Sequence, residues 1–182
     1  MEKERLDYAR DSLGEDVSYI DQMMTDIIFE YSGDLDLIMQ NIKDEVLMVD
    51  YPAIMTIEKY FMELSNALYF TCEKVERLGI YDSLSKIKAQ ETYNTKFLKA
   101  ANPDEGKKPT VGEIQAIAEN GTIYDKTLND IYNKAYKVLK SKVQAAETMT
   151  STLSKILTHR MQESQMTTAQ TERKILNETN HF

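Results

Sequence analysis

The residues best suited to chemistry are lysines interleaved with aromatic side chains. Ten lysines lie between positions 86 and 140, and Tyr93, Phe97 and Tyr136 lie among them. Lysines neutralise phosphates and aromatic rings stack on any base, so this pattern is typical of non-specific single-stranded nucleic-acid binding. The lysines expected to contact phosphates are Lys86, Lys88, Lys96, Lys99, Lys107, Lys108, Lys134, Lys137 and Lys140.

The second half of this set follows helical spacing. At about 100° per residue, Lys126, Lys134, Lys137 and Lys140 fall within an arc of about 120° and form one basic stripe bordered by Tyr136. In a hairpin these lysines would converge on those near Tyr93. The alternative, which we favour for the ring pairs, is that aromatic residues spaced i, i+4 pack together in the core. Nearby acidic residues also dilute the stripe, which predicts weak and salt-sensitive binding.

Other reactive residue types are sparse. The histidines are His159 and His181, and neither lies at a zinc-ligand spacing from a cysteine or carboxylate. Cys72 lies near an apolar helix face, which indicates an inert thiol rather than a nucleophile. The acidic pair Asp44–Glu45 joins adjacent residues and does not define a catalytic cleft. We therefore expect no metal, no cofactor and no enzymatic activity.

The charge is divided unevenly along the chain. Residues 1–78 carry 7 Lys and Arg against 18 Asp and Glu, whereas residues 79–182 carry 15 against 12. Such asymmetry is typical of a nucleic-acid-binding part beside an acidic part that meets a partner, but solvated helix faces that differ by chance would give the same numbers.

Composition predicts the elements that must position these residues. Apolar residues make up 42% of 182, with only 6 Gly and 3 Pro, which favours an all-α fold. One cysteine, no signal-peptide pattern and no apolar run of membrane-spanning length predict a cytoplasmic protein that does not enter a membrane. We expect an elongated helical hairpin of two long helices, with coiled-coil-like packing and shorter N-terminal helices.

The first long helix is expected after Pro52 and would run to about Ala101. Its apolar positions alternate spacings of three and four, as in a helix that packs along its length on another. Gly79 is the expected break or kink. The predicted buried seam is Ile57, Phe61, Leu64, Leu68, Thr71, Val75 and Leu78.

A loop and a short helix are expected to follow. Residues 102–109 contain two prolines, a glycine and four charges, which predicts an exposed loop. Thr110 and Glu113 match a capping box at the start of a short helix over 110–120, and Asn120–Gly121 would end it.

The second long helix is expected from Thr122 to about Gln165. Lys142 occupies a seam position, where it would either set register or extend its ammonium group to solvent from the edge. The predicted buried seam is Leu128, Ile131, Ala135, Val138, Lys142, Ala145, Met149, Thr152 and Ile156.

The ends of the chain give weaker patterns. Residues 1–50 form an acidic helical segment in which Gly14 and Gly33 would separate short helices and Asp34 would cap the third. Residues 51–166 form the hairpin, and residues 167–182 form a polar tail with at most one further short helix.

The order of these parts resembles the UvsY-like recombination mediator proteins of tailed phages. The resemblance covers roughly residues 57–163 and includes the Thr-x-x-Glu-Ile start at 110–114 and the Leu-Thr-His-Arg sequence at 157–160. It implies a helical homo-oligomer in the host cytoplasm that binds single-stranded DNA and loads a RecA-type recombinase onto strands coated by single-strand-binding protein. The competing hypothesis is a structural or scaffolding protein, such as a virion or assembly component, without nucleic-acid binding.

Overall fold

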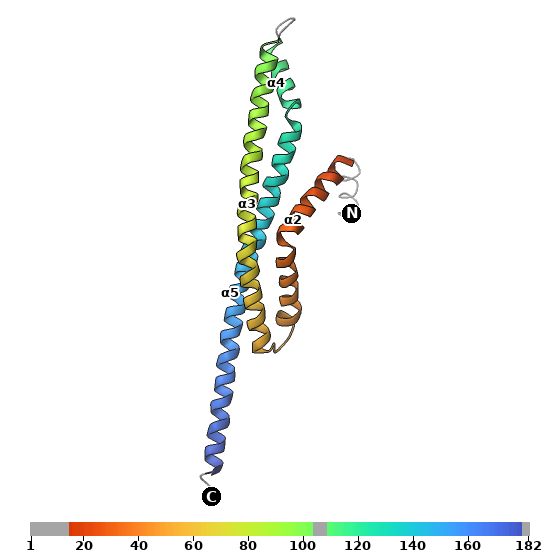
Figure 1. The fold of residues 1–182 in the computed structure, drawn as a ribbon. Helices are drawn as coiled ribbons and strands as arrows, with labels where there is room; N and C mark the ends of the chain where they lie inside the picture. Colours follow the sequence, from red (N-terminus) through yellow and green to blue (C-terminus); the bar gives the residue numbers. More distant parts are fainter. Residues whose placement is uncertain (1–14, 104–108, 180–182) are drawn as a thin grey trace. The chain divides into compact units, whose positions relative to one another are not determined.

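The computed structural model describes residues 15–103 and 109–179, with side chains described for 18–103, 109–171 and 173. The elements are α2 (Glu15–Ile42), the π-helix η1 (Lys43–Leu47), α3 (Ile54–Ala101), α4 (Val111–Asn120) and α5 (Ile123–Thr179), drawn in Figure 1. The described ranges contain no strand, which confirms the all-α prediction. The chain divides into two compact units: unit 1 comprises residues 1–32 and 72–141, and unit 2 comprises residues 33–71 and 142–182.

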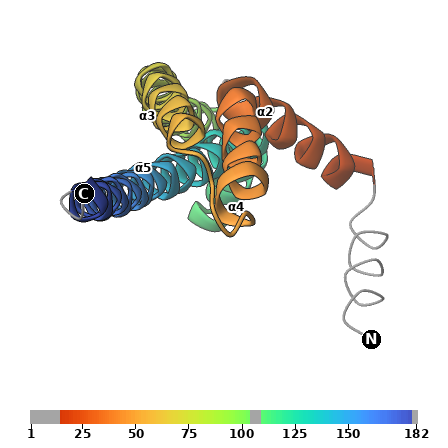
Figure 2. The same cartoon turned by 90° about the horizontal axis from the view of Figure 1, so that it is seen from below.

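Unit 2 has an apolar core supplied by three helices and η1. After η1 the chain reverses direction over residues 48–53 (Figure 2), where Pro52 is buried. α3 then begins, and the Ala53 carbonyl accepts the N–H groups of Thr56 and Ile57 at 3.0 and 3.1 Å. The core cluster consists of Leu35, Ile42, Val46, Ile57, Tyr60, Leu64, Ala146 and Leu153.

Unit 1 pairs the C-terminal part of α3 with the N-terminal part of α5 in antiparallel order. Asn133 of α5 contacts Asp82 of α3, and the ring of Tyr136 of α5 lies against Gly79 of α3. Residue numbers therefore rise along α5 as they fall along α3. Val75, Leu78 and Ala89 of α3 and Ile131, Ala135 and Leu139 of α5 are buried. The helical-hairpin prediction is confirmed.

The predicted seam of α3 is confirmed along its length, but the seam of α5 is only partly right beyond residue 135. In α3, five of the seven predicted positions are buried and two are half-buried. In α5 the buried residues are Leu139, Ala146 and Leu153, each one position beyond the predicted Val138, Ala145 and Thr152. The predicted Met149 and Ile156 are half-buried and pack against the core cluster of unit 2. The buried positions step by four from Ala135 to Leu139 and by seven after that, so the error arises from one predicted step of three where the helix takes a step of four.

Three predicted helix boundaries are also wrong. α2 runs through Gly33, with Asp34 exposed inside it rather than at a cap, and α3 runs through Gly79. A single glycine costs a helix only about 1 kcal/mol, which burial of neighbouring apolar side chains offsets. α5 continues through 167 to Thr179 rather than yielding to a separate tail helix. Gly14 lies outside the described residues.

Gly79 has a packing role in place of the predicted break. A Cβ atom on Gly79 would lie 3.1 Å from Cε2 of Tyr136, so the missing side chain leaves room for that ring. The close approach of the two helices here depends on glycine.

The predicted capping box is present. The Thr110 N–H donates to Oε2 of Glu113 at 2.7 Å, and the Glu113 N–H donates to the Thr110 hydroxyl at 3.4 Å. These hydrogen bonds to the ionised form lower the pKa of Glu113. α4 ends at Asn120, as expected, with the Gly121 N–H donating to the Ile117 carbonyl.

Lys142 does not extend freely to solvent. Its half-buried ammonium group forms an ion pair with Asp36 of α2, within unit 2. This contact fits the alternative in which the lysine helps to set register.

Candidate nucleic-acid interface

A small groove in unit 1 brings together two of the lysines singled out in the sequence. It has a volume of about 350 Å³ and lies where α3, α4 and α5 meet. α3 supplies Lys86 and Tyr93, α4 supplies Glu119, and α5 supplies Lys126 and Asn129. The complete lining is Lys86, Ala89, Gln90, Tyr93, Glu119, Lys126 and Asn129.

A polar cluster fixes the register of the two helices beside this groove. Asn129 Nδ2 donates to Ser85 Oγ at 3.0 Å and to the Asp82 carbonyl at 3.1 Å. Asn133 Nδ2 donates to Asp82 Oδ2 at 3.1 Å. Ser85 is buried, and hydrogen bonds at such a position are costly to break. The cluster therefore holds Lys86 of α3 and Lys126 of α5 on the same groove.

The aromatic residues of the groove are already engaged. The ring of Tyr93 stacks on Phe97 with centroids 6.1 Å apart and an interplanar angle of 29°, and Lys126 Nζ lies 5.5 Å from the Tyr93 centroid. The two rings pack on each other, but both are half-buried rather than in the core, where the favoured alternative placed them. In this arrangement the groove offers cations and amides to a ligand, rather than an open stacking platform.

The remaining lysines of the basic stripe extend along α5. Lys134, Lys137 and Lys140 are exposed, and Lys140 Nζ lies 5.8 Å from the centroid of Tyr136. Because they share an arc of α5 with Lys126, these side chains continue the positive potential of the groove along the helix.

The other lysines of the predicted set do not join the groove. Lys88 Nζ lies 3.7 Å from Asp125 Oδ1, and the aliphatic stem of Lys96 lies next to Gly121, where a Cβ would come within 3.1 Å of Lys96 Cγ. Lys99 is exposed near the end of α3. Lys107 and Lys108 lie outside the described residues.

Sequence reasoning missed the neutral and acidic members of the groove. Gln90 and Asn129 add amide groups that can hydrogen-bond a phosphate or a base edge, and Glu119 adds a negative charge that weakens phosphate binding. The available signal was the pair Asn129 and Asn133, which lie one helical turn apart on the same face of the expected helix.

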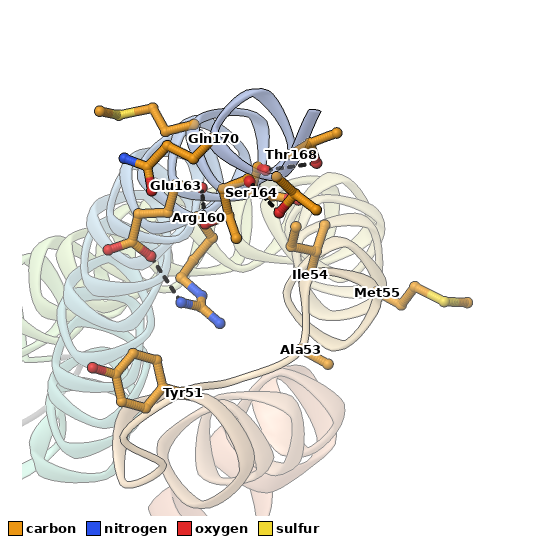
Figure 3. A pocket seen from close by; sticks show the side chains of 12 residues that line it. Tyr51, Ala53, Ile54, Met55, Arg160, Glu163, Ser164, Thr168 and Gln170 are labelled. Carbon is orange, nitrogen blue, oxygen red and sulfur yellow. Dashed lines mark hydrogen bonds and ion pairs between the residues drawn. The ribbon is translucent and has the colours of Figure 1, made fainter. Parts of the chain in front are cut away.

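Unit 2 holds a larger cleft of about 940 Å³ between the start of α3 and the C-terminal part of α5 (Figure 3). Arg160 stacks on Tyr51 with its guanidinium carbon 5.1 Å from the ring centroid, and its Nη1 donates to Glu163 Oε2 at 2.8 Å. The hydroxyls of Thr167 and Thr168 donate to backbone carbonyls of α5. These hydroxyls and Arg160 Nη1 are therefore engaged by the protein itself, whereas the buried Nε of Arg160 has no hydrogen-bond partner among the described residues.

The part of the chain that the structure describes contains no group of three or more His, Cys, Asp or Glu residues able to hold a metal ion. His159 is exposed and its Nδ1 lies 3.5 Å from Glu163 Oε1, whereas His181 falls outside the described ranges. Cys72 is half-buried.

No helix within residues 15–103 and 109–179 combines the length and apolar character needed to cross a bilayer. Comparisons of the chain with protein-family models, with curated proteins and with solved structures find no match.

Proposed function

We propose that this protein binds single-stranded DNA through the groove lined by Lys86 and Lys126 and through the basic stripe that continues it along α5. The observation that carries the proposal is that Lys86 and Lys126, forty positions apart in the sequence, line one groove. The amide side chains of Gln90 and Asn129 line the same groove. Ammonium groups bind phosphate oxygens, and amides satisfy the polar edges of sugar or base.

The charge distribution supports the same proposal. Residues 72–141 carry 12 Lys and Arg against 10 Asp and Glu, whereas residues 1–32, the rest of unit 1, carry 3 against 9. Positive potential concentrated on one face attracts a polyanion even when the net charge is negative. Glu119 and Asp130 reduce that potential, so the affinity should be modest and should fall steeply with salt.

The resemblance to UvsY-like mediators extends this proposal to a cellular role. Under it, the protein assists the loading of a RecA-type recombinase onto single strands during phage replication or repair, acts in the host cytoplasm, and works as a homo-oligomer with a recombinase or single-strand-binding protein as partner. It needs no cofactor and is not an enzyme.

A salt titration tests DNA binding. The double variant Lys86→Ala/Lys126→Ala should bind a fluorescent oligothymidine more weakly, and the slope of log K against log salt should be shallower by about 1.4, since each lost phosphate contact on a single strand contributes about 0.7. The matched control is Lys74→Ala/Lys155→Ala, which removes two exposed lysines away from the groove. It should leave the slope unchanged.

Two results would contradict the proposal. One is an absence of binding by the wild-type chain at low salt. The other is an equal loss of affinity in the groove variant and in the control, which would mean that lysines contribute to binding wherever they lie and that the groove is not the site.

A second candidate function is structural: a helical scaffold or assembly component that does not bind nucleic acid. It is favoured by the large apolar side chains that α3 exposes, including Met55, Met62 and Tyr69 in unit 2, each more than 70% exposed. Exposed apolar surface of this kind is typical of protein–protein contact. The same DNA titration separates the two functions.

A further inference from the structure

α3 carries a second apolar face in unit 1, on the side away from its core. Ile80, Leu84, Ile87 and Leu98 are between 54% and 61% exposed. At about 100° per residue they fall within an arc of about 60°, centred about 180° from the buried residues Val75, Leu78 and Ala89 of the same helix. We call these four exposed residues the α3 stripe. Glu73 and Glu91 also lie in this arc, but four large exposed apolar side chains on one helix face are typical of a surface that meets a partner.

One edge of the α3 stripe is basic. Arg77, Lys88 and Lys99 follow it on one side within an arc of about 40°, whereas Glu76, Ser83 and Asn94 follow the other side. Arg77 pairs with the exposed Glu73, and such exposed ion pairs contribute little and exchange readily. Lys88 Nζ lies 3.7 Å from Asp125, whose side chain is 13% exposed, and it retains an exposed side chain of its own. A partner with carboxylates beside apolar groups would fit this edge.

α2 offers such a surface in the same unit. Tyr19 and Phe29 are 68% and 75% exposed, and the exposed carboxylates of Asp26 and Glu30 lie on the same side of the helix. We call these four residues the α2 acidic face. The opposite side of α2 is already packed: burial raises the pKa of Tyr31, and the neighbouring Glu30, Tyr81 and Tyr132 raise it further.

We propose that the α2 acidic face of one copy of this protein binds the α3 stripe of a second copy. The two aromatic rings would cover the aliphatic side chains, and the carboxylates of Asp26 and Glu30 would face Arg77 and Lys88. Apolar burial supplies the affinity and the charges fix the orientation. Both surfaces are exposed within one chain, so a single copy cannot satisfy either of them.

Charge disfavours one alternative, the antiparallel pairing of two α3 stripes. An antiparallel pair of stripes would place the basic edge of one copy against the basic edge of the other, which costs energy. The α2–α3 contact instead joins opposite charges. It is heterologous, because each copy uses two different surfaces, so it repeats from copy to copy and closes into a ring or continues as a filament.

A charge-exchange experiment without nucleic acid tests this contact by sedimentation velocity. Chains carrying Asp26→Lys/Glu30→Lys and chains carrying Arg77→Glu/Lys88→Glu should each sediment as smaller species than the wild type. An equimolar mixture should regain the wild-type species, because every α2 face then finds a complementary stripe. Helical content equal to that of the wild type, measured by circular dichroism, confirms that each variant is folded.

Each alternative result would overturn the proposal. A wild-type chain that is monomeric at about 100 µM, far above the dissociation constants of specific complexes, would show that no such contact forms. Variants that associate like the wild type would show that the charges do not meet. A mixture that stays dissociated would show that another pair of surfaces is used.

A second pair of variants tests the apolar part. Leu84→Ser/Ile87→Ser changes only exposed side chains and should abolish self-association while the chain stays folded. The matched control is Met62→Ser, an exposed residue of α3 in unit 2, which should leave association unchanged. Suppose that Leu84→Ser/Ile87→Ser loses association and that the charge-exchange mixture does not recover it. The α3 stripes of two copies would then bind each other, and the α2–α3 contact would be overturned.

Discussion

α3 and α5 contribute to both units but pack differently in each. In unit 2 they bury large side chains, such as Ile57, Tyr60 and Leu64, together with α2 residues. In unit 1 they approach at Gly79 and meet through the polar cluster around Asp82. Apolar burial gives stability without strong directionality, whereas hydrogen bonds fix geometry at modest net gain. Unit 1 also buries apolar side chains, including Leu78 and Leu139, so its polar cluster adds a fixed helix register to an apolar core rather than replacing one.

The largest effect is expected from a core truncation in unit 2. Leu64 is fully buried in the core cluster, so Leu64→Ala should lower the free energy of unfolding by about 3 kcal/mol, through lost burial and the cavity left behind. Urea unfolding followed by circular dichroism measures this change. The control Met62→Ala, at a position 71% exposed, should stay within about 0.5 kcal/mol of the wild type. Equal losses would remove the contrast between buried and exposed faces of α3.

A smaller effect is expected from the polar cluster of unit 1. Asp82→Ala removes the carboxylate that accepts from Asn133 and should lower stability by about 1 to 2 kcal/mol, because a half-buried amide loses its acceptor. Hydrogen exchange should accelerate around 82–89 and 129–136 more than in unit 2. Ser83→Ala serves as the control, since Ser83 is exposed and bonds only the Gly79 carbonyl of its own helix. Uniform acceleration in both units would contradict a local role for the cluster.

The fold could be predicted from the sequence because helical periodicity is a local signal. The α3 seam, the Thr110 capping box and the end of α4 at Gly121 all depend on residues within a few turns of one another. The errors at Gly33 and Gly79 share one cause. A glycine lowers helix propensity locally, but the tertiary contacts that offset this cost, such as the ring of Tyr136, come from distant residues.

The candidate site could be predicted only in outline. The lysine stripe of α5 follows from angular spacing, but which lysines of α3 lie beside it depends on helix register. That register is set by Asp82 and Asn129, residues 47 positions apart, whose pairing leaves no periodic trace. Lys86 therefore lies on the groove while Lys88, two residues away, turns toward Asp125.

The smallest effect at neutral pH, and the clearest pH signature, is expected at Tyr60 in unit 2. Its side chain is almost fully buried, and burial, followed by a hydrogen bond to Glu45 and the charges of Glu45 and Glu63, raises its pKa from 10.0 to about 12. The unfolded chain therefore ionises this phenol first. The stability that neutral Tyr60 contributes is present below pH 10 and is lost as the pH rises from 10 toward 12.

Tyr60→Phe removes the titrating group and its hydrogen bond. At pH 7 we expect a loss of about 1 kcal/mol, as for one hydrogen bond, and above pH 10 the difference from the wild type should shrink, because only the wild type must keep a buried phenol protonated. Urea midpoints measured from pH 7 to 11.5 test this. Tyr69→Phe, at a position 71% exposed, should follow the wild-type profile throughout. If the urea midpoints of Tyr60→Phe and the wild type change in parallel with pH, Tyr60 ionises with the same pKa in the folded and the unfolded chain. The apolar core of unit 2 would then be more open to solvent than its packing indicates.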